Sequence, residues 1–355
     1  MANLYTPYKI FHFPRKLDSL APESETITPP LHVRIKPTNL CGHHCWYCAY
    51  KADDLQLGSG MVERDQIPRE KMLEIISDLE EMGVGAVTFS GGGDPFYYKP
   101  LLETVKRLAD SPIRFASLTN GARLSGELAE AFAHHGTWLR VSLDGWDDVS
   151  YAKYRGIRVG EYTKLMENLA AFKRLGGSCY LGISLIVDRD NATHVEDSVK
   201  RLQDLGVDSV KVSPCITSND GKKSNQYHQP FFSTVRAQLD RLQAEAPTGS
   251  FELFDAYHEL DEKFDKPYNW CPYLQVLCVI GADLKVYSCQ DKAYTQEGLL
   301  GSIANQRFSD MWFDRKDKFY RINPQRDCAH HCVANKKNQM LSEYCSADPD
   351  HLFFA

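Results

Sequence analysis

Short apolar runs alternate with amphipathic segments through the middle of the chain. Six apolar runs predict buried β-strands, at residues 31–37, 85–90, 113–118, 138–144, 179–187 and 209–214. Six segments carry apolar residues at helical spacing, at residues 69–83, 101–109, 125–135, 161–175, 194–206 and 232–245. This alternation is typical of a parallel sheet covered by helices, either a barrel or an open doubly wound fold. In both folds, functional side chains gather at the carboxyl ends of the strands.

The segments on either side of this repeat have a different pattern. Residues 1–30 are punctuated by prolines and close in ITPP, which predicts an extended N-terminal arm. Residues 249–355 are rich in aromatic residues and contain six cysteines, with a predicted hairpin in VIGADLKVYS whose turn holds Gly281 and Asp283. We therefore expect an arm, an α/β domain over residues 31–248, and a small α+β domain after it.

Composition narrows the classes of partner. The chain has 355 residues, with 43% hydrophobic and 25% charged, as in ordinary globular proteins. No run approaches the roughly 18 apolar residues that a membrane span requires. A net charge of −6 without a long basic cluster argues against a nucleic-acid surface. The first residues lack the apolar core of a signal peptide, so we expect a cytoplasmic protein.

Cysteine is frequent, with 11 residues, and the sequence CGHHCWYC places three of them directly after the first predicted strand. In the reducing cytosol such thiols are more often metal ligands or catalytic groups than disulfides. A zinc site normally takes four ligands, whereas an iron–sulfur cluster held by Cys41, Cys45 and Cys48 would leave one iron free to bind another molecule. The alternatives are half of a zinc site, a disulfide framework, or a chance grouping in a chain with 11 cysteines.

This loop resembles the signature of the radical S-adenosylmethionine (SAM) enzymes, which has the spacing C-x3-C-x2-C and an aromatic residue, here Tyr47, before the last cysteine. The resemblance implies a partial (β/α)6 barrel of the TIM type. It also implies a [4Fe–4S] cluster on Cys41, Cys45 and Cys48, whose free iron chelates the amino and carboxylate groups of SAM. Cleavage of SAM then yields a 5′-deoxyadenosyl radical that takes a hydrogen atom from the substrate.

A glycine-rich motif, SGGGDP at residues 90–95, follows the second predicted strand. Alone it could be a phosphate loop or merely a tight turn. Beside the cysteine loop it resembles the Gly-Gly-Glu-Pro motif of the same family, with an aspartate in place of the glutamate. The resemblance implies that Gly92, Gly93 and Asp94 receive the amino group of SAM.

The next two strands also end in polar motifs, in the order that this family would have. LTNG presents Thr119 and Asn120, and VSLDG presents Ser142 and Asp144 on one face of a strand. Either motif alone could be a hydrogen-bonded turn. The resemblance assigns Ser142 and Asp144 to the ribose and methionine parts of SAM. It assigns Arg155 to the carboxylate, which a guanidinium fork suits geometrically.

The C-terminal cysteines resemble the SPASM/twitch extension of radical SAM enzymes, which binds one or two auxiliary iron–sulfur clusters. The full pattern includes a C-x2-C pair that this chain lacks, so the resemblance implies one auxiliary cluster, expected to be [4Fe–4S]. A structural zinc ion is the alternative. The expected ligands are Cys271, Cys278, Cys289 and Cys332, with Cys328 as the substitute and Cys345 as a less certain ligand.

The substrate is open between two classes. Many relatives with this extension modify ribosomal peptides, and we favour a peptide or protein side chain. The alternative is a sugar, aminocyclitol or other small metabolite that is dehydrogenated or epimerised. A flavodoxin or ferredoxin would supply the electrons. A non-catalytic iron–sulfur electron carrier or redox sensor is the alternative outside enzymes, but it would not need the SAM motifs.

Two further residues are candidates for catalysis. Epimerisation requires a hydrogen donor, and Cys215 lies just beyond the sixth predicted strand, although a structural thiol is the interpretation that we favour. In sulfatase-maturing relatives an aspartate directly after the third auxiliary cysteine acts as a base. Here Gln290 stands at that position and Asp291 follows it, so that activity is not carried over and Asp291 is only a candidate base.

Overall fold

One sheet organises the molecule in a computed structural model that describes residues 4–52, 55, 57–245, 251–258 and 264–354. The strand order is β10-β9-β8-β1-β2-β3-β4-β5-β6-β7. The strands are β1 (His32–Ile35), β2 (Ala86–Phe89), β3 (Arg114–Thr119), β4 (Trp138–Leu143), β5 (Tyr180–Val187), β6 (Ser209–Pro214), β7 (Glu252–Asp255), β8 (Leu277–Ile280), β9 (Lys285–Tyr287) and β10 (Leu299–Ser302).

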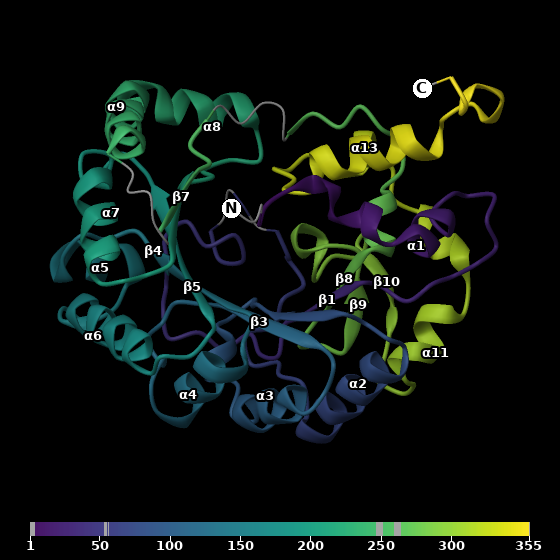
Figure 1. The fold of residues 1–355 in the computed structure, drawn as a ribbon, viewed down its shortest axis with the longest axis horizontal. Coiled ribbons are helices and arrows are strands. Elements are labelled where there is room, and N and C mark those ends of the chain that lie inside the picture. Colours follow the sequence, from purple (N-terminus) through teal and green to yellow (C-terminus); the bar gives the residue numbers. More distant parts are fainter. Residues whose placement is uncertain (1–3, 53–54, 56, 246–250, 259–263, 355) are drawn as a thin grey trace.

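The sheet forms a partial barrel. β1 to β7 pair in parallel in sequence order, and β8 also pairs in parallel with the free edge of β1. Among the described strands, β7 and β10 are the two edges. The parallel α/β architecture predicted from the alternating pattern is confirmed, and the sheet curves within a layer of helices (Figure 1). Parallel strands bring their carboxyl ends to one edge, which places the loops after them together.

The six predicted helices are all present within a few residues of their expected bounds, and α5 and α8 are added. The α-helices after the N-terminal arm are α2 (Arg69–Glu81), α3 (Leu101–Ala109), α4 (Gly126–His135), α5 (Asp148–Arg155), α6 (Glu161–Arg174), α7 (Val195–Asp204), α8 (Gly221–His228), α9 (Phe232–Ala244), α11 (Phe308–Phe313), α12 (Pro324–Asp327) and α13 (Asn335–Cys345). The shorter 3-10 helices there are η2 (Pro95–Tyr97), η3 (Gln229–Phe231), η4 (Pro272–Gln275), η5 (Gln290–Lys292), η6 (Lys316–Tyr320) and η7 (Pro349–His351).

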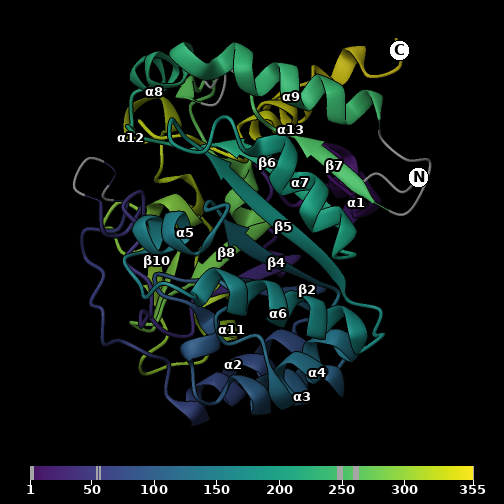
Figure 2. The ribbon, with the colours of Figure 1, turned by 90° about the vertical axis from the view of Figure 1, so that its left-hand side faces the viewer.

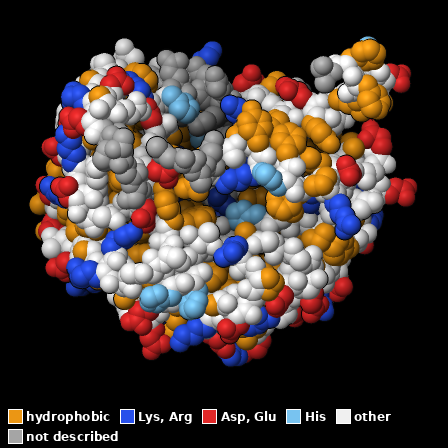
Figure 3. Space-filling model, viewed as in Figure 1, with side chains coloured by type: hydrophobic (Ala, Val, Ile, Leu, Met, Phe, Trp, Pro, Cys, Tyr) orange, Lys and Arg blue, Asp and Glu red, His pale blue; other side chains and the backbone are white. Residues whose placement is uncertain are grey.

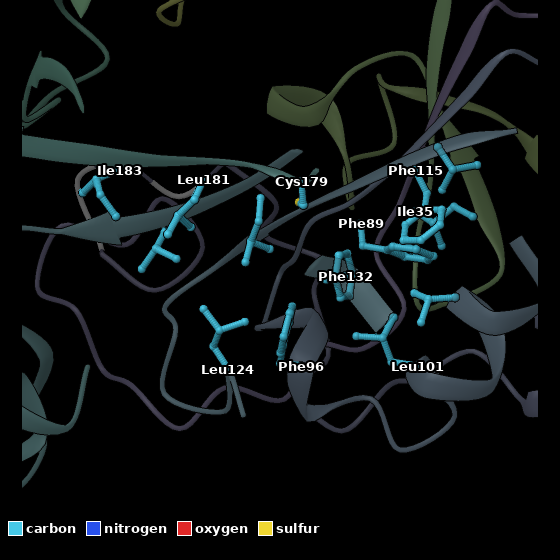
Figure 4. Close-up of a cluster of buried hydrophobic side chains, with 14 of the residues drawn as sticks. Ile35, Phe89, Phe96, Leu101, Phe115, Leu124, Phe132, Cys179, Leu181 and Ile183 are labelled. Carbon is cyan, nitrogen blue, oxygen red and sulfur yellow. The ribbon is translucent and has the colours of Figure 1, made fainter. Parts of the chain in front are cut away.

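The main hydrophobic core lies between the sheet and the outer helices (Figure 4). The ring of Phe132 on α4 stacks on Phe96, with centroids 5.2 Å apart, and meets the edge of Phe115 on β3 at 5.5 Å. All three side chains are buried. A fully buried phenylalanine contributes about 1.5–3 kcal/mol to the free energy of unfolding. Because Phe96 follows the motif SGGGDP, this packing also anchors the glycine loop.

The N-terminal arm differs from the extended segment that its prolines predicted. It folds into η1 (Pro7–His12) and α1 (Pro14–Asp18). Proline is favourable in the first turn of a helix, where no backbone N–H is needed, so here the prolines begin helices. The arm packs in a second hydrophobic cluster made of Ile10, Leu17, Leu20, Val276 and Leu341.

The C-terminal segment continues the sheet of the barrel. β8 and β9 form the predicted hairpin, and β8 lies against β1. On the outer side, the carboxylate of Asp78 in α2 accepts a hydrogen bond from the backbone N–H of Phe308 at the start of α11, at 2.7 Å. The domain boundary expected at residues 248–249 lies outside the described residues. Through β8, the C-terminal cysteines are attached directly to the strand that precedes the cysteine loop.

The two ends of the barrel differ. In Figure 2, β5 points toward the side that carries the loop after β1, and both chain termini lie on the opposite side. Figure 3 shows that opposite face, with acidic and basic side chains interspersed and a central hollow. A cavity of about 430 Å³ lies at these amino ends, between the strands, the N-terminal arm and α13. Within the described part of the chain, no helix is long and apolar enough to cross a membrane.

Candidate active site

A cavity of about 530 Å³ lies at the carboxyl ends of the strands. It brings together side chains that are far apart in the sequence, because parallel strands end at the same edge. Twelve of the residues predicted from sequence motifs line it: Cys41, Cys45, Tyr47, Cys48, Gly92, Gly93, Asp94, Thr119, Asn120, Ser142, Arg155 and Asp291.

The cysteine loop presents its three thiols to this cavity. The backbone N–H of His43 lies 3.4 Å from the sulfur of Cys41, and Nη1 of Arg155 lies 3.6 Å from the sulfur of Cys45. Burial raises the pKa of Cys41 to about 11 and also raises the pKa of Cys45. Thiolates are the metal-binding form, and a bound cation favours them, so this set of half-buried thiols fits a metal cluster.

The glycine loop runs directly against the residues that precede Cys41. A Cβ atom at Gly93 would lie 2.1 Å from the carbonyl oxygen of Leu40, and one at Gly92 would lie 2.4 Å from Oδ1 of Asn39. The backbone N–H of Asp94 donates to the Leu40 carbonyl at 2.9 Å. Only glycine permits this approach, so the two motifs form one structural unit.

Asp94 joins the glycine loop to the end of β3. Its carboxylate accepts hydrogen bonds from Oγ1 of Thr119 at 2.9 Å, from the backbone N–H of Asn120 at 2.6 Å and from the backbone N–H of Phe96 at 2.9 Å. Burial raises the pKa of Asp94, and these hydrogen bonds act in the opposite direction. The carboxylate therefore has several protein partners already, and it positions the loop.

Arg155 and Asp144 form a buried ion pair, with Nε 2.9 Å from Oδ2. Tyr47 also donates a hydrogen bond to Asp144. Burial would lower the pKa of Arg155, but the adjacent carboxylate raises it well above its usual value. Nη2 of Arg155 is buried without a partner among the described residues. Arg155 lines the cavity and Asp144 does not, so Asp144 holds the guanidinium while a free donor is left for a carboxylate.

A second cavity, of about 130 Å³, lies beside β1 and is lined by Cys271, Cys289, Cys328 and Cys332. Burial, together with the nearby Cys332 and Cys328, raises the pKa of Cys271 to about 12. Burial raises the pKa of Cys289, and so do Asp291 and the other three cysteines of this cavity. The four sulfur atoms are therefore close neighbours.

Two other C-terminal cysteines lie elsewhere. Cys278 is fully buried in β8, beside Val33 of β1, and the charged group that acts on its thiol is Lys16. Cys345 is the last residue of α13 and packs against the second hydrophobic cluster, which the N-terminal arm forms with Val276 and Leu341. Neither lines the second cavity. Three of the four ligands expected for an auxiliary cluster, Cys271, Cys289 and Cys332, line the same cavity. The fourth cysteine there is Cys328, which the sequence pattern gave as the substitute, and not the expected Cys278.

Gln290 and Asp291 line both cavities. Burial raises the pKa of Asp291 to about 6, against the opposing effect of Arg34, Lys36 and Lys266. Ligand atoms of Cys289, Asp291 and His330 lie within 4.8 Å of one another, a grouping that could also hold a single metal ion. Asp291 is therefore the candidate base that the structure brings next to both sites.

Cys215 is not brought to the cavity. Its side chain is buried, whereas its neighbours Pro214 and Ile216 line the cavity wall. Its carbonyl oxygen accepts a hydrogen bond from Nε2 of His228 at 2.8 Å. Burial raises the pKa of the Cys215 thiol well above its usual value. This is the environment of a structural thiol.

Sequence motifs missed a buried lysine beside the site. Lys36 is fully buried, and its Nζ donates to Oη of Tyr50 at 2.5 Å and to the carbonyl oxygen of Gly91 at 3.0 Å. The available signal was a lysine inside the apolar run LHVRIKP, two residues after Arg34 and hence on the same face of the strand.

The chain is similar to known proteins over part of its length. Residues 35–202 match the family model of the radical SAM superfamily. PqqA peptide cyclase of Bradyrhizobium diazoefficiens is 28% identical over 195 residues, which cover 54% of this chain and 48% of the relative. Pre-heme d1 synthase of Dinoroseobacter shibae is 25% identical over 228 residues, covering 62% and 54%. The chain thus spans about half the length of these curated relatives.

The fold resembles that of a solved structure. Streptococcus suis SuiB bound to its precursor peptide SuiA superposes with a TM-score of 0.63, at 15% identity, over 90% of this chain and 72% of SuiB. At this identity the likeness concerns the fold alone. Its coverage extends beyond the barrel into the C-terminal segment.

Proposed function

We propose that the chain is a radical SAM enzyme acting on a peptide or protein side chain, since residues 35–202 match the family model of the radical SAM superfamily. When bound, SAM and a reduced [4Fe–4S] cluster supply a 5′-deoxyadenosyl radical that abstracts a hydrogen atom from the substrate. The observation that carries the proposal is the single cavity shared by the cysteine loop, the glycine loop and Arg155.

The residues of this cavity have separable roles. Cys41, Cys45 and Cys48 would hold the cluster. The backbone of Gly92 and Gly93 would receive the amino group of SAM, and the unpaired Nη2 of Arg155 suits its carboxylate. Asp94 would act with the two glycines at the amino group. The remaining predicted contacts, which would bind or orient the rest of SAM, are Tyr47, Thr119, Asn120, Ser142 and Asp144.

We propose that Cys271, Cys289, Cys328 and Cys332 hold one auxiliary cluster. Four thiols around one cavity fit a [4Fe–4S] cluster, which takes four protein thiolates. A structural zinc ion also takes four cysteine ligands, so analysis of bound metal and sulfide must distinguish zinc from an iron–sulfur cluster. This assignment replaces Cys278 by Cys328 and leaves Cys345 without a ligand role.

A peptide substrate is supported by two of the similar proteins, since one is named a peptide cyclase and the other is bound to a precursor peptide. Asp291 is the proposed base, because it lines the SAM cavity. Modification of a small metabolite is the second candidate, supported by the likeness to pre-heme d1 synthase. Epimerisation through Cys215 is not part of the proposal, because a hydrogen donor must reach the cavity.

The proposed chemistry also sets requirements on the surroundings. Cleavage of SAM needs an electron, for which a flavodoxin or ferredoxin is the proposed donor. The structure pairs none of the eleven cysteines in a disulfide, and free thiols of this kind fit the reducing cytoplasm that we propose.

The test is anaerobic. The protein is reconstituted with iron and sulfide, reduced with dithionite and supplied with SAM, and 5′-deoxyadenosine is measured by chromatography. We expect it from the wild type and from a Cys179→Ala control, whose thiol lies in the core away from the cavity. A Cys45→Ala variant should give none. Wild-type protein that holds its clusters and releases none, even with candidate peptides present, would refute the proposal.

A further inference from the structure

Two positively charged side chains, Arg34 and Lys36, lie at the carboxyl end of β1, near the two cysteine sites. Arg34 lies on β1, and Lys36 follows the end of that strand on the same face. Arg34 lines the cavity of the four C-terminal cysteines. The backbone N–H of Lys36 donates to the carbonyl of Ile280 at 2.8 Å, which continues the pairing of β1 with β8. The position of Lys36 is therefore set by the sheet.

The ammonium group of Lys36 connects the loops that form both sites. Its partner Tyr50 lies two residues after Cys48, and its partner Gly91 begins the glycine loop. Oη of Tyr50 donates in turn to the carbonyl of Gln290, at 3.2 Å, next to Cys289. A chain of hydrogen bonds therefore runs from the first cysteine loop to the auxiliary cysteines, with Lys36 at its centre.

The charge of Lys36 has no carboxylate within ion-pair distance among the described residues. Burial, and to a smaller extent the nearby Arg34, lower its pKa to about 7. Asp291 and the thiols of Cys289 and Cys48 act in the opposite direction. An isolated buried ammonium is costly, so anionic groups on both sides are the partners that this site requires. Cys48 belongs to the first cysteine loop, and Cys289 belongs to the second cavity.

We propose that Lys36 is a positioning residue whose buried positive charge raises the reduction potentials of both iron–sulfur clusters. This inference rests on the proposed function. Reduction adds negative charge to a cluster, and a nearby cation in a medium of low dielectric constant stabilises the reduced form more than the oxidised form. Arg34 lines only the auxiliary cavity, so its charge acts mainly on the auxiliary cluster.

The experiment is a redox titration of the reconstituted full-length protein, followed by electron paramagnetic resonance. Lys36→Met removes the charge at similar length. At the wild-type midpoint potentials, we expect the ratio of reduced to oxidised cluster to fall about tenfold at both sites, equivalent to about 59 mV for one electron. Arg34→Met should lower only the auxiliary potential. Lys106→Met, which alters an exposed lysine paired with Glu127, should change neither.

Charge and structural support are separated by two more variants. Lys36→Arg keeps the charge and should restore both potentials toward wild type. Tyr50→Phe removes the hydrogen-bonded link but keeps the charge, so its potentials should stay near wild type. Unchanged potentials in Lys36→Met with full iron content would overturn the inference. If Lys36→Met loses its clusters, Tyr50→Phe decides: unaltered potentials support the charge role, and lowered potentials overturn it.

The outcome is distinct from a failure of the proposed function. If the wild type forms 5′-deoxyadenosine while Lys36→Met retains both potentials, only the role of Lys36 is lost. If the wild type assembles no redox-active cluster and forms no 5′-deoxyadenosine, the proposed function itself is wrong.

Discussion

The two cysteine sites of this protein are built in opposite ways. Cys41, Cys45 and Cys48 lie within one loop, so their proximity follows from spacing along the chain. The four cysteines around the second cavity come from four places between residues 271 and 332, joined by a hairpin and short helices. A local site can be recognised by its spacing, whereas a dispersed site depends on how the chain folds between its ligands. Both sites are attached to β1.

The largest expected effect separates the two sites by function. Cys45→Ser should abolish 5′-deoxyadenosine formation, because the cluster that binds SAM loses one of its three protein ligands. The auxiliary cluster should remain, since its cysteines line a different cavity. Product chromatography and iron analysis of the same sample measure both. Loss of all iron would show that the two sites assemble together, which would break the comparison.

The second prediction tests which cysteines are ligands of the auxiliary cluster. Cys328→Ser should remove the auxiliary cluster and so about half of the iron of a protein with two [4Fe–4S] clusters. Cys278→Ser is the matched control, because that thiol is buried in β8 away from the cavity. Iron and sulfide analysis should therefore distinguish the two variants. The reverse result would return Cys278 to the ligand set.

The third prediction concerns the contact between the cysteine loop and the glycine loop. Gly93→Ala should weaken SAM binding about tenfold, or about 1.4 kcal/mol, because its Cβ would crowd the Leu40 carbonyl. Gly85→Ala is the control, since its Cβ would lie at an ordinary distance of 3.5 Å from the Leu31 carbonyl. Equilibrium binding of SAM to the reconstituted proteins provides the measurement. Equal affinities would show that the loops can separate without loss.

The smallest effect concerns the attachment of the C-terminal segment. Asp78→Asn should lower the free energy of unfolding by about 1–2 kcal/mol, because the buried carboxylate loses a charge-assisted hydrogen bond to the Phe308 N–H. Asp110→Asn, at the end of α3, is a control at an exposed position. Thermal denaturation followed by circular dichroism compares them. An equal melting temperature would show that β8, and not α11, supplies the attachment.

Sequence pattern was sufficient for the regular parts of the fold. The alternation of apolar strands and amphipathic helices located β1 to β6 and the helices between them, because burial of one face imposes a period that can be read locally. It misjudged the N-terminal arm, since a proline favours both extended chain and the first turn of a helix. Packing of Ile10 and Leu17 on the C-terminal segment decided between them.

The sequence by itself determined the local chemistry of the first site. The spacing of the three cysteines and the glycine motif needed no knowledge of the fold, because each lies within a few residues. Only the tertiary structure decided which C-terminal thiols meet, since Cys278 is drawn into the sheet while Cys328 is brought to the cavity. It also decided that Lys36 is buried between the two sites, because that position depends on strands from both halves of the chain lying against β1.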